Sequence, residues 1–201
     1  MEVIKGLISK LNTQSDKRAL ALINQICTYG QDAVGLLIRA AKDPTAPRFQ
    51  KWALRALGQS NHASATKTLI RALRDPKMTI RQQALRALRD QGRQENGKYL
   101  VPLLQDPSGG IRENAADAIA ELKYKPARTQ LIKCLEDEKW YVRQRAAVAL
   151  GILGGKNSVP ALRALAASEI RKVVIKAATD ALAAIAGNCV PKERGTSNKL
   201  R

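Results

Sequence analysis

The chain has 201 residues, which is enough for one domain with a sizeable core. Hydrophobic residues make up 45% of the chain but aromatic residues only 3%, so the core must consist of Leu, Ile, Val and Ala; no apolar run is long enough to span a membrane. The 35 Lys and Arg against 17 Asp and Glu give a net charge of +18, which favours an anionic partner: nucleic acid, an acidic protein or a membrane surface.

Two amphipathic stripes occupy the first thirty residues. Because apolar residues spaced three and four apart line one side of a helix, both stripes predict short helices. We interpret residues 1–30 as a divergent pair that caps a stack of repeats, with Ser15 as a candidate N-cap of the second helix. The stripes are Val3, Ile4, Leu7, Ile8 and Leu11, followed by Leu20, Ile23, Ile26 and Cys27.

A nine-residue pattern then recurs along the chain. Apolar residues occupy positions 1, 5, 8 and 9 of each copy, which form one face of a helix. Another amphipathic segment precedes each copy, and Asp-Pro dipeptides separate the two segments in three of the repeats. Proline lacks an amide donor and disfavours helix at the preceding residue, so each dipeptide ends the first helix of a pair. The copies begin at Phe49, Ile80, Ile111 and Val142, 31 residues apart, and at Val174, 32 residues further on.

Self-similarity at this period is typical of helical repeat proteins. We predict an all-α, right-handed α-solenoid of about six antiparallel helix pairs. The capping pair lies in residues 1–30, and the repeats of residues 31–187 continue the same domain. Residues 188–201 are polar and basic without apolar periodicity, so we expect a disordered tail there.

The helix pairs, the Asp-Pro turns and an Asp followed six residues later by Arg resemble HEAT repeats. The segment from Val142 to Gly151, VRQRAAVALG, is especially similar to the phycobilin-lyase (E–Z) HEAT-like subclass. The resemblance covers about residues 31–187 and implies the solenoid fold. For function it implies a range, because such repeats serve as adaptors, scaffolds, bilin lyases and nucleic-acid-binding proteins.

Three arginines recur at one position of the pattern: Arg81, Arg112 and Arg143 each follow an Asp by six residues. They could form a basic row for a ligand. We favour a structural interpretation, in which each Asp caps the second helix of its pair and the arginines pair with these carboxylates along the stack. In the first repeat the Asp and Arg are five residues apart, and Ile175 replaces the arginine in the last, so we expect the ladder to stop at both ends.

One tryptophan lies where the second helices should line the concave face of the solenoid. Positions 3, 4 and 7 of each copy are the expected exposed positions. Trp52 holds position 4 of the first copy, where later copies have Gln83, Asn114 and Arg145. If exposed, Trp52 would be a binding hot spot or a stacking platform; if packed against the neighbouring helix, it would only fill space. The sequence leaves both possibilities open.

Basic residues cluster between Arg39 and Arg93, where thirteen Lys and Arg accompany three acidic residues and give a net charge of +10. Because this cluster overlaps Trp52, we interpret it as a binding surface rather than as a solvated face that only maintains solubility. The predicted binding residues are Lys51, Trp52, Arg55, Gln82, Gln83, Arg86, Arg89 and Arg145.

No catalytic or metal-binding motif is present in the sequence. The three cysteines form no CxxC pair and the only histidine, His62, lies in a predicted helix-start loop, so we expect no zinc site. Phosphate-loop, dinucleotide, zinc-protease and nucleophile-elbow motifs are absent. We therefore expect no enzymatic activity and no cofactor. The odd cysteine count and the lack of a signal-peptide pattern favour a reducing, cytoplasmic setting.

These observations favour a non-catalytic scaffold whose basic concave face docks an acidic protein. The Gln, Glu and Asp interleaved with the cations suit a specific mosaic of contacts. DNA or RNA binding by the same surface is the alternative, favoured by the charge cluster and the basic tail. A role in bilin attachment or phycobilisome handling rests on the family resemblance alone. The sequence indicates no oligomeric state.

Overall fold

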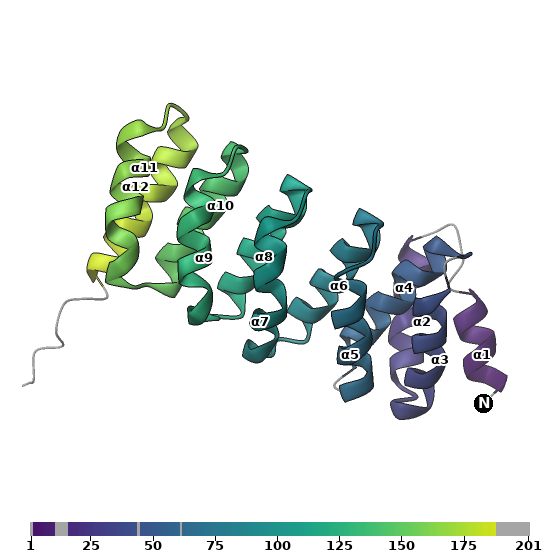
Figure 1. Ribbon diagram of the computed structural model, residues 1–201. Helices are drawn as coiled ribbons and strands as arrows, with labels where there is room; N and C mark the ends of the chain where they lie inside the picture. Colours follow the sequence, from purple (N-terminus) through teal and green to yellow (C-terminus); the bar gives the residue numbers. More distant parts are fainter. Residues whose placement is uncertain (1, 11–15, 44, 61, 188–201) are drawn as a thin grey trace, which may run out of the picture.

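The protein is an all-helical stack. The computed structural model describes residues 2–10, 16–43, 45–60 and 62–187, and over these residues it contains no strand. In the described part of the chain, twelve α-helices form six antiparallel pairs, which stand side by side from the N-terminal to the C-terminal end (Figure 1). The predicted all-α solenoid of about six helix pairs is confirmed. The candidate N-cap Ser15 and the predicted tail, residues 188–201, lie outside the described residues.

Each pair consists of a first and a second helix, and we number the pairs 1 to 6 along the chain. The first helices are α1 (Glu2–Ser9), α3 (Gln31–Lys42), α5 (Ala63–Ala72), α7 (Gly97–Leu100), α9 (Arg128–Lys133) and α11 (Val159–Ser168). The second helices are α2 (Asp16–Cys27), α4 (Pro47–Gly58), α6 (Met78–Asp90), α8 (Gly109–Glu121), α10 (Trp140–Leu153) and α12 (Lys172–Gly187). Over the described residues, none of these helices combines the length and apolar character needed to cross a membrane.

Short 3₁₀ segments complete several first helices. Pro102 lies at the start of one of them, and its missing amide hydrogen removes a backbone bond that would continue α7 as an α-helix. The segments are η2 (Gln94–Asn96), η3 (Val101–Gln105), η4 (Lys125–Ala127), η5 (Cys134–Glu136) and η6 (Lys156–Ser158).

The second helices pack closely against one another along the stack, more extensively than the first helices do. Small residues allow this approach: a Cβ on Gly58 would lie 2.8 Å from the Cα of Ala87, and one on Gly151 would lie 3.0 Å from the Cα of Ala181. The second helices therefore form one closely packed row. We call the exposed side of these helices the second-helix face.

The apolar positions of the repeat form one continuous core. Ile80, Ala84, Ala87 and Leu88, at positions 1, 5, 8 and 9 of their copy, are all buried, as the periodicity predicts. Cys134 joins this core as a free thiol, and burial, with the nearby charge of Asp137, raises its pKa to about 11. Such a thiol is unreactive at neutral pH and serves as a small apolar side chain.

The recurring arginines form a ladder of buried ion pairs between consecutive turns. Arg81 Nε lies 2.7 Å from Asp106 Oδ2, and Arg112 Nε lies 2.7 Å from Asp137 Oδ2. Each guanidinium also donates through Nη1 to a carbonyl of the turn that precedes its own helix, at 3.0 Å for Arg81 and 2.9 Å for Arg112. One arginine therefore links two turns, and the predicted pairing of these arginines with carboxylates along the stack is confirmed.

The ladder ends on a different acid, and its aspartates cap the helices in a different way from the prediction. Arg143 pairs with Glu169, at 2.7 Å from Nε to Oε2. The aspartates are not N-caps: Lys77, not Asp75, is the N-cap of α6. Asp75 lies two residues earlier, and its Oδ1 accepts the Lys77 amide at 2.8 Å. This Asx turn, repeated in the following pairs, shapes the entry into the second helix.

Candidate basic binding surface

Trp52 is buried, so the interpretation of this residue as an exposed hot spot is wrong. Only 1% of its surface is exposed, and it belongs to the hydrophobic core. Its helix, α4, contacts both α2 and α6, and this packing between neighbours encloses a position that the repeat pattern alone marks as exposed. The indole Nε1 has no acceptor among the residues described by the structure.

The buried ring instead supports two of the predicted cations. Lys51 Nζ lies 4.7 Å from the centroid of the Trp52 ring, and Arg55 Cζ lies 5.8 Å from it. Cation–π contacts of this kind contribute about 0.5–1 kcal/mol at exposed sites. Trp52 therefore positions Lys51 and Arg55 on the second-helix face without belonging to that face.

Four of the predicted residues meet in one polar cavity, which we call the basic pocket. It has a volume of about 200 Å³ and lies where α4, α6 and α8 adjoin. Gln83 is 7% exposed and forms no hydrogen bond to another described residue, so its amide is available to the cavity. The lining residues are Arg55, Gln83, Arg86, Ala87, Arg89, Asp90 and Asn114.

The guanidinium groups of the basic pocket differ in their partners. Arg89 is shared between Asp90, at 3.2 Å, and Glu121, at 3.5 Å. Arg86 and Arg55 form no ion pair within the described part of the chain, and the Arg55 guanidinium lies over the Trp52 ring. Two cations in adjacent helices therefore remain free to meet an external anion.

Arg145 does not join the basic pocket. It lies on α10, where its guanidinium is 3.3 Å from Asp117 and 3.8 Å from Glu113. These acidic side chains of α8 neutralise it. Lys51 and Gln82 are half-buried and lie outside the lining of the pocket, on α4 and α6. The structure thus brings together half of the eight predicted binding residues.

Two polar lining residues were not among the predicted binding residues. Asn114 occupies position 4 of its copy, the position of Gln83, so the repeat register itself was a signal for it. Asp90 follows Arg89 at the end of α6 and carries no such signal. Together they add an amide and a carboxylate to a cationic cavity.

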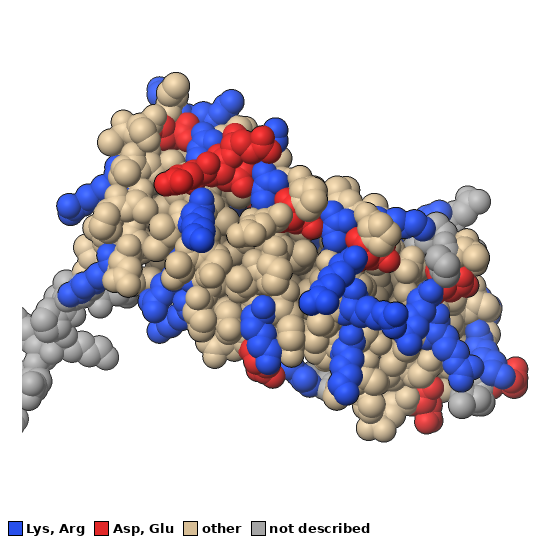
Figure 2. Space-filling model, in the orientation of Figure 1, with Lys and Arg blue, Asp and Glu red and all other residues tan. Residues whose placement is uncertain are grey.

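The distribution of charge along the stack is uneven. Figure 2 shows Lys and Arg side chains gathered over the N-terminal half of the visible face, whereas Asp and Glu collect in a group near the C-terminal end. Within the described residues, no group of three or more His, Cys, Asp and Glu could hold a metal ion. The surface offers charge and hydrogen bonds for recognition.

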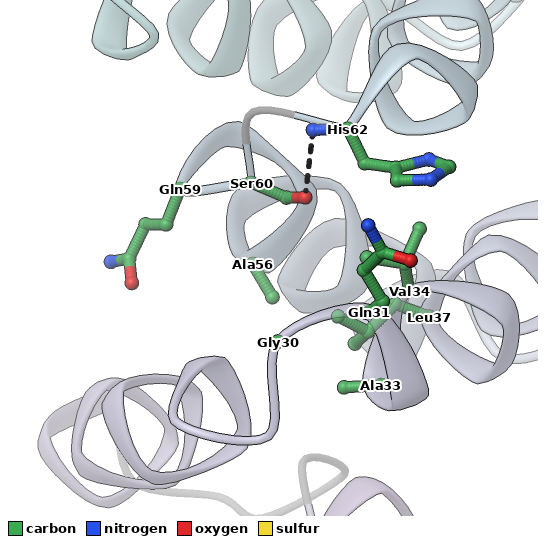
Figure 3. A pocket seen from close by; sticks show the side chains of 9 residues that line it. All are labelled: Gly30, Gln31, Ala33, Val34, Leu37, Ala56, Gln59, Ser60 and His62. Atoms are coloured by element: carbon green, nitrogen blue, oxygen red, sulfur yellow. Dashed lines mark hydrogen bonds between the residues drawn. The ribbon is translucent and has the colours of Figure 1, made fainter.

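A second cavity, of about 360 Å³, lies beside the loops that join pairs 1, 2 and 3 (Figure 3). His62 is at its rim as the N-cap of α5, where the ring Nδ1 accepts the amide of Ser64. Its own amide donates to Ser60 Oγ at 3.2 Å. His62 therefore serves the start of a helix. The cavity is lined by Gly30, Gln31, Ala33, Val34, Leu37, Ala56, Gln59, Ser60 and His62.

Solved structures share the architecture. An engineered protein has a TM-score of 0.63 at 20% identity, over 93% of this chain and 98% of that one. A designed armadillo repeat protein in complex with the peptide (KR)4 has a TM-score of 0.61 at 20% identity, over 90% and 99% of the two chains. At this level of identity, the likeness shows the fold alone. No curated protein matches the chain.

The finer resemblance, to the phycobilin-lyase subclass, receives little support. The complex of CpcE and CpcF of phycocyanin lyase from Nostoc sp. PCC7120 has a TM-score of 0.41 at 18% identity, over 90% of this chain and 94% of that one. A likeness this distant carries no argument about activity. The HEAT-repeat family, in contrast, matches residues 4–89, 45–119 and 97–183, which together span the six helix pairs. With its helix pairs, Asx turns and arginine ladder, this chain belongs to the HEAT-repeat family.

Proposed function

We propose that the protein is a non-catalytic scaffold whose second-helix face docks an acidic segment of a partner protein. The observation that carries the proposal is the basic pocket, where Arg55 and Arg86 project without carboxylate partners among the described residues. Lys51 extends the same charge along α4, held against the Trp52 ring. An acidic side chain bound there would form charge-assisted hydrogen bonds.

The mixed chemistry of the basic pocket favours a protein over a nucleic acid. Gln83 and Asn114 offer amide donors and acceptors, and Asp90 places a negative charge in the lining, which would repel a continuous row of phosphates. Among the described residues, no aromatic side chain lines the cavity to stack on a base. The armadillo solenoid of similar fold was solved with the basic peptide (KR)4. The exposed charge on α4 and α6 is positive, so it would attract an acidic peptide instead.

The test is a binding titration with a fluorescein-labelled peptide of alternating Glu and Ser, followed by anisotropy near 150 mM salt. The double variant Arg55→Gln/Arg86→Gln should raise the Kd about tenfold, which corresponds to ~1.4 kcal/mol. The matched control is Lys133→Gln/Arg163→Gln, which removes two exposed cations from first helices. Equal losses in both variants would show that only net charge matters and would refute the proposed site.

Nucleic acid is the second candidate, because residues 39–93 carry a net charge of +10. Phosphate contacts release counterions, so this mode predicts an affinity for DNA or RNA that falls steeply with salt. The same titration with labelled duplex DNA and single-stranded RNA distinguishes peptide binding from nucleic-acid binding. Micromolar or tighter binding of an oligonucleotide at about 150 mM salt, together with weaker peptide binding, would replace the first proposal by this one.

The proposed role includes no catalytic step and no cofactor. A cytoplasmic location is part of the same proposal. The buried free thiol of Cys134 supports this compartment, because a reducing environment keeps such thiols unpaired. Pair 1 is proposed to cap the stack, with the repeats of residues 31–187 carrying the binding surface.

A further inference from the structure

The arginine ladder is interrupted between pairs 2 and 3. Its rungs join residues 25 apart, Arg81 to Asp106 and Arg112 to Asp137. The same register would join residue 50 to Asp75, but residue 50 is glutamine. Asp75 forms no ion pair with another described residue. The step between α4 and α6 therefore lacks the guanidinium that fills the same place in the next three steps.

A cavity of about 590 Å³ occupies this step, and we call it the ladder-gap cavity. Gln50 is buried, at 6% exposure, and its Oε1 has no hydrogen-bond donor among the described residues. A buried acceptor without a partner is unfavourable, so a donor brought by a ligand would be stabilised there. The lining residues are Ala41, Lys42, Gln50, Thr68, Arg71, Ala72, Arg74, Asp75 and Pro76.

Three cations line the same cavity as this acceptor. Lys42 ends α3, Arg71 lies on α5, and Arg74 lies in the turn that follows; all three side chains are exposed. None of them forms an ion pair within the described part of the chain. With the half-buried Asp75 as the only acidic lining residue, the cavity carries a net positive charge.

We propose that the ladder-gap cavity is a second binding site, which takes an acidic peptide segment. Backbone amides of the segment donate to Gln50 Oε1 and to the Asp75 carboxylate, and an Asp or Glu side chain of the segment pairs with Lys42, Arg71 and Arg74. The volume is in the range of sites that enclose a compact ligand. The cavity is lined by the first helices α3 and α5, by the buried Gln50 of α4 and by the turn after α5. It shares no lining residue with the basic pocket, so it does not depend on the function proposed for the second-helix face.

The lining favours a peptide over an oligonucleotide. Two acceptors line the cavity, Gln50 Oε1 and the Asp75 carboxylate, and a peptide main chain supplies amide donors along its length. Asp75 would repel a row of phosphates, and no aromatic side chain is present to stack on a base.

The decisive variant is Gln50→Arg, which restores the residue found at this position in the next three copies. The new guanidinium should pair with Asp75 and occupy the cavity, so the Tm should rise while binding weakens. The binding loss is diagnostic because the substitution adds a positive charge, and charge alone would strengthen binding of an acidic peptide. Gln50→Leu removes the acceptor at similar volume and without changing the charge, and it should also weaken binding.

Binding is measured by anisotropy with the labelled Glu-Ser peptide on full-length chain carrying Arg55→Gln/Arg86→Gln, so that the second-helix face contributes little. Gln50→Arg and Arg71→Gln should each raise the Kd at least fivefold. Arg163→Gln, at the equivalent place on α11, is the matched control and should leave the Kd within twofold. A Kd that is unchanged or lower in Gln50→Arg, or losses as large in the control, would overturn the proposal.

A competition experiment identifies the kind of ligand. A single-stranded RNA of equal charge should fail to displace the peptide near 150 mM salt. If RNA displaces the peptide, and Gln50→Arg abolishes the binding of RNA, the cavity would be assigned to nucleic acid and the peptide proposal would be overturned. Failure of the Arg55→Gln/Arg86→Gln test with success here would refute only the second-helix face.

Discussion

Pairs 2 and 3 and pairs 4 to 6 are built on the same repeat, but they use their positive charge differently. In the later pairs the arginines of the second helices all have carboxylate partners: Arg112 and Arg143 are rungs of the ladder, and Arg145 faces two carboxylates of α8. In the earlier pairs Arg81 is also a rung, but Arg86 forms no ion pair within the described residues, and neither does Arg71 of the first helix α5. One helical scaffold can therefore pair all its second-helix arginines with carboxylates in one half and leave some of them available for binding in the other.

The largest expected effect comes from breaking a rung in the paired half. Arg112→Ala leaves Asp137 buried without its cation, since both side chains are only 10% exposed, and should destabilise the protein by about 3–5 kcal/mol. Arg145→Ala removes an equally charged side chain that is 38% exposed and should cost at most ~1 kcal/mol. Urea denaturation followed by circular dichroism measures both. Equal losses in the free energy of unfolding would show that the rung arginine stabilises the protein no more than the surface arginine does.

The ladder should also make stability depend on acid. Burial by itself raises the pKa of Asp106. Hydrogen bonds from Arg81 and the Ser108 amide, together with the charges of Arg81 and Arg112, lower this pKa by a larger amount, so it lies below its ordinary value. A depressed pKa contributes stability above the unfolded value of about 4, and this contribution is lost as the pH falls through the folded value.

Asp106→Asn should therefore be less stable than the natural chain at pH 7, by roughly 2 kcal/mol, and the gap should narrow below about pH 4. Thermal denaturation at a series of pH values measures the gap. Asp90→Asn, at a carboxylate that is 47% exposed, is the control and should show little difference at any pH. A gap that stays constant down to pH 2 would contradict the assignment of this stability to the rung.

Close packing of the second helices should be common to both halves. Gly58→Ala and Gly151→Ala each place a Cβ within 3.0 Å of a backbone atom of the next helix, so each should destabilise by about 1–3 kcal/mol. Gly35→Ala, within α3 and with no neighbouring atom within 4 Å, should instead stabilise by about 0.5–1 kcal/mol. Urea midpoints provide the measurement. Destabilisation at only one of the two packed glycines would mean that the halves differ in packing as well as in charge.

The smallest effect should come from removing the carboxylate partners of an arginine in pairs 4 to 6. Glu113→Gln/Asp117→Asn releases Arg145 onto the second-helix face and should lower the Kd for the labelled Glu-Ser peptide about two- to threefold. The control Glu95→Gln/Glu136→Gln makes the same change in net charge at exposed carboxylates elsewhere. If both variants bind equally well, the position of Arg145 on the face has no influence.

The period of the sequence was sufficient to predict the twelve helices and the ladder, because both follow from spacing within one repeat. It was insufficient for Trp52, since burial of that side chain depends on packing between α4 and its neighbours, which no single repeat contains. The basic pocket was predicted in part: Gln83 and Arg86 follow from register, whereas Asp90 does not. The ladder gap at Gln50 can be read from the sequence only once the 25-residue spacing of the rungs is known.

The ladder also gives the array a direction, with a consequence for shortened chains. Each arginine reaches forward to the acid of the following turn, so every pair that donates a guanidinium relies on its C-terminal neighbour. Deletion of pairs 1 and 2 would sever none of the three rungs. Deletion of pair 6 would strand Arg143 without Glu169. The molecule should therefore tolerate trimming from its beginning far better than trimming from its end.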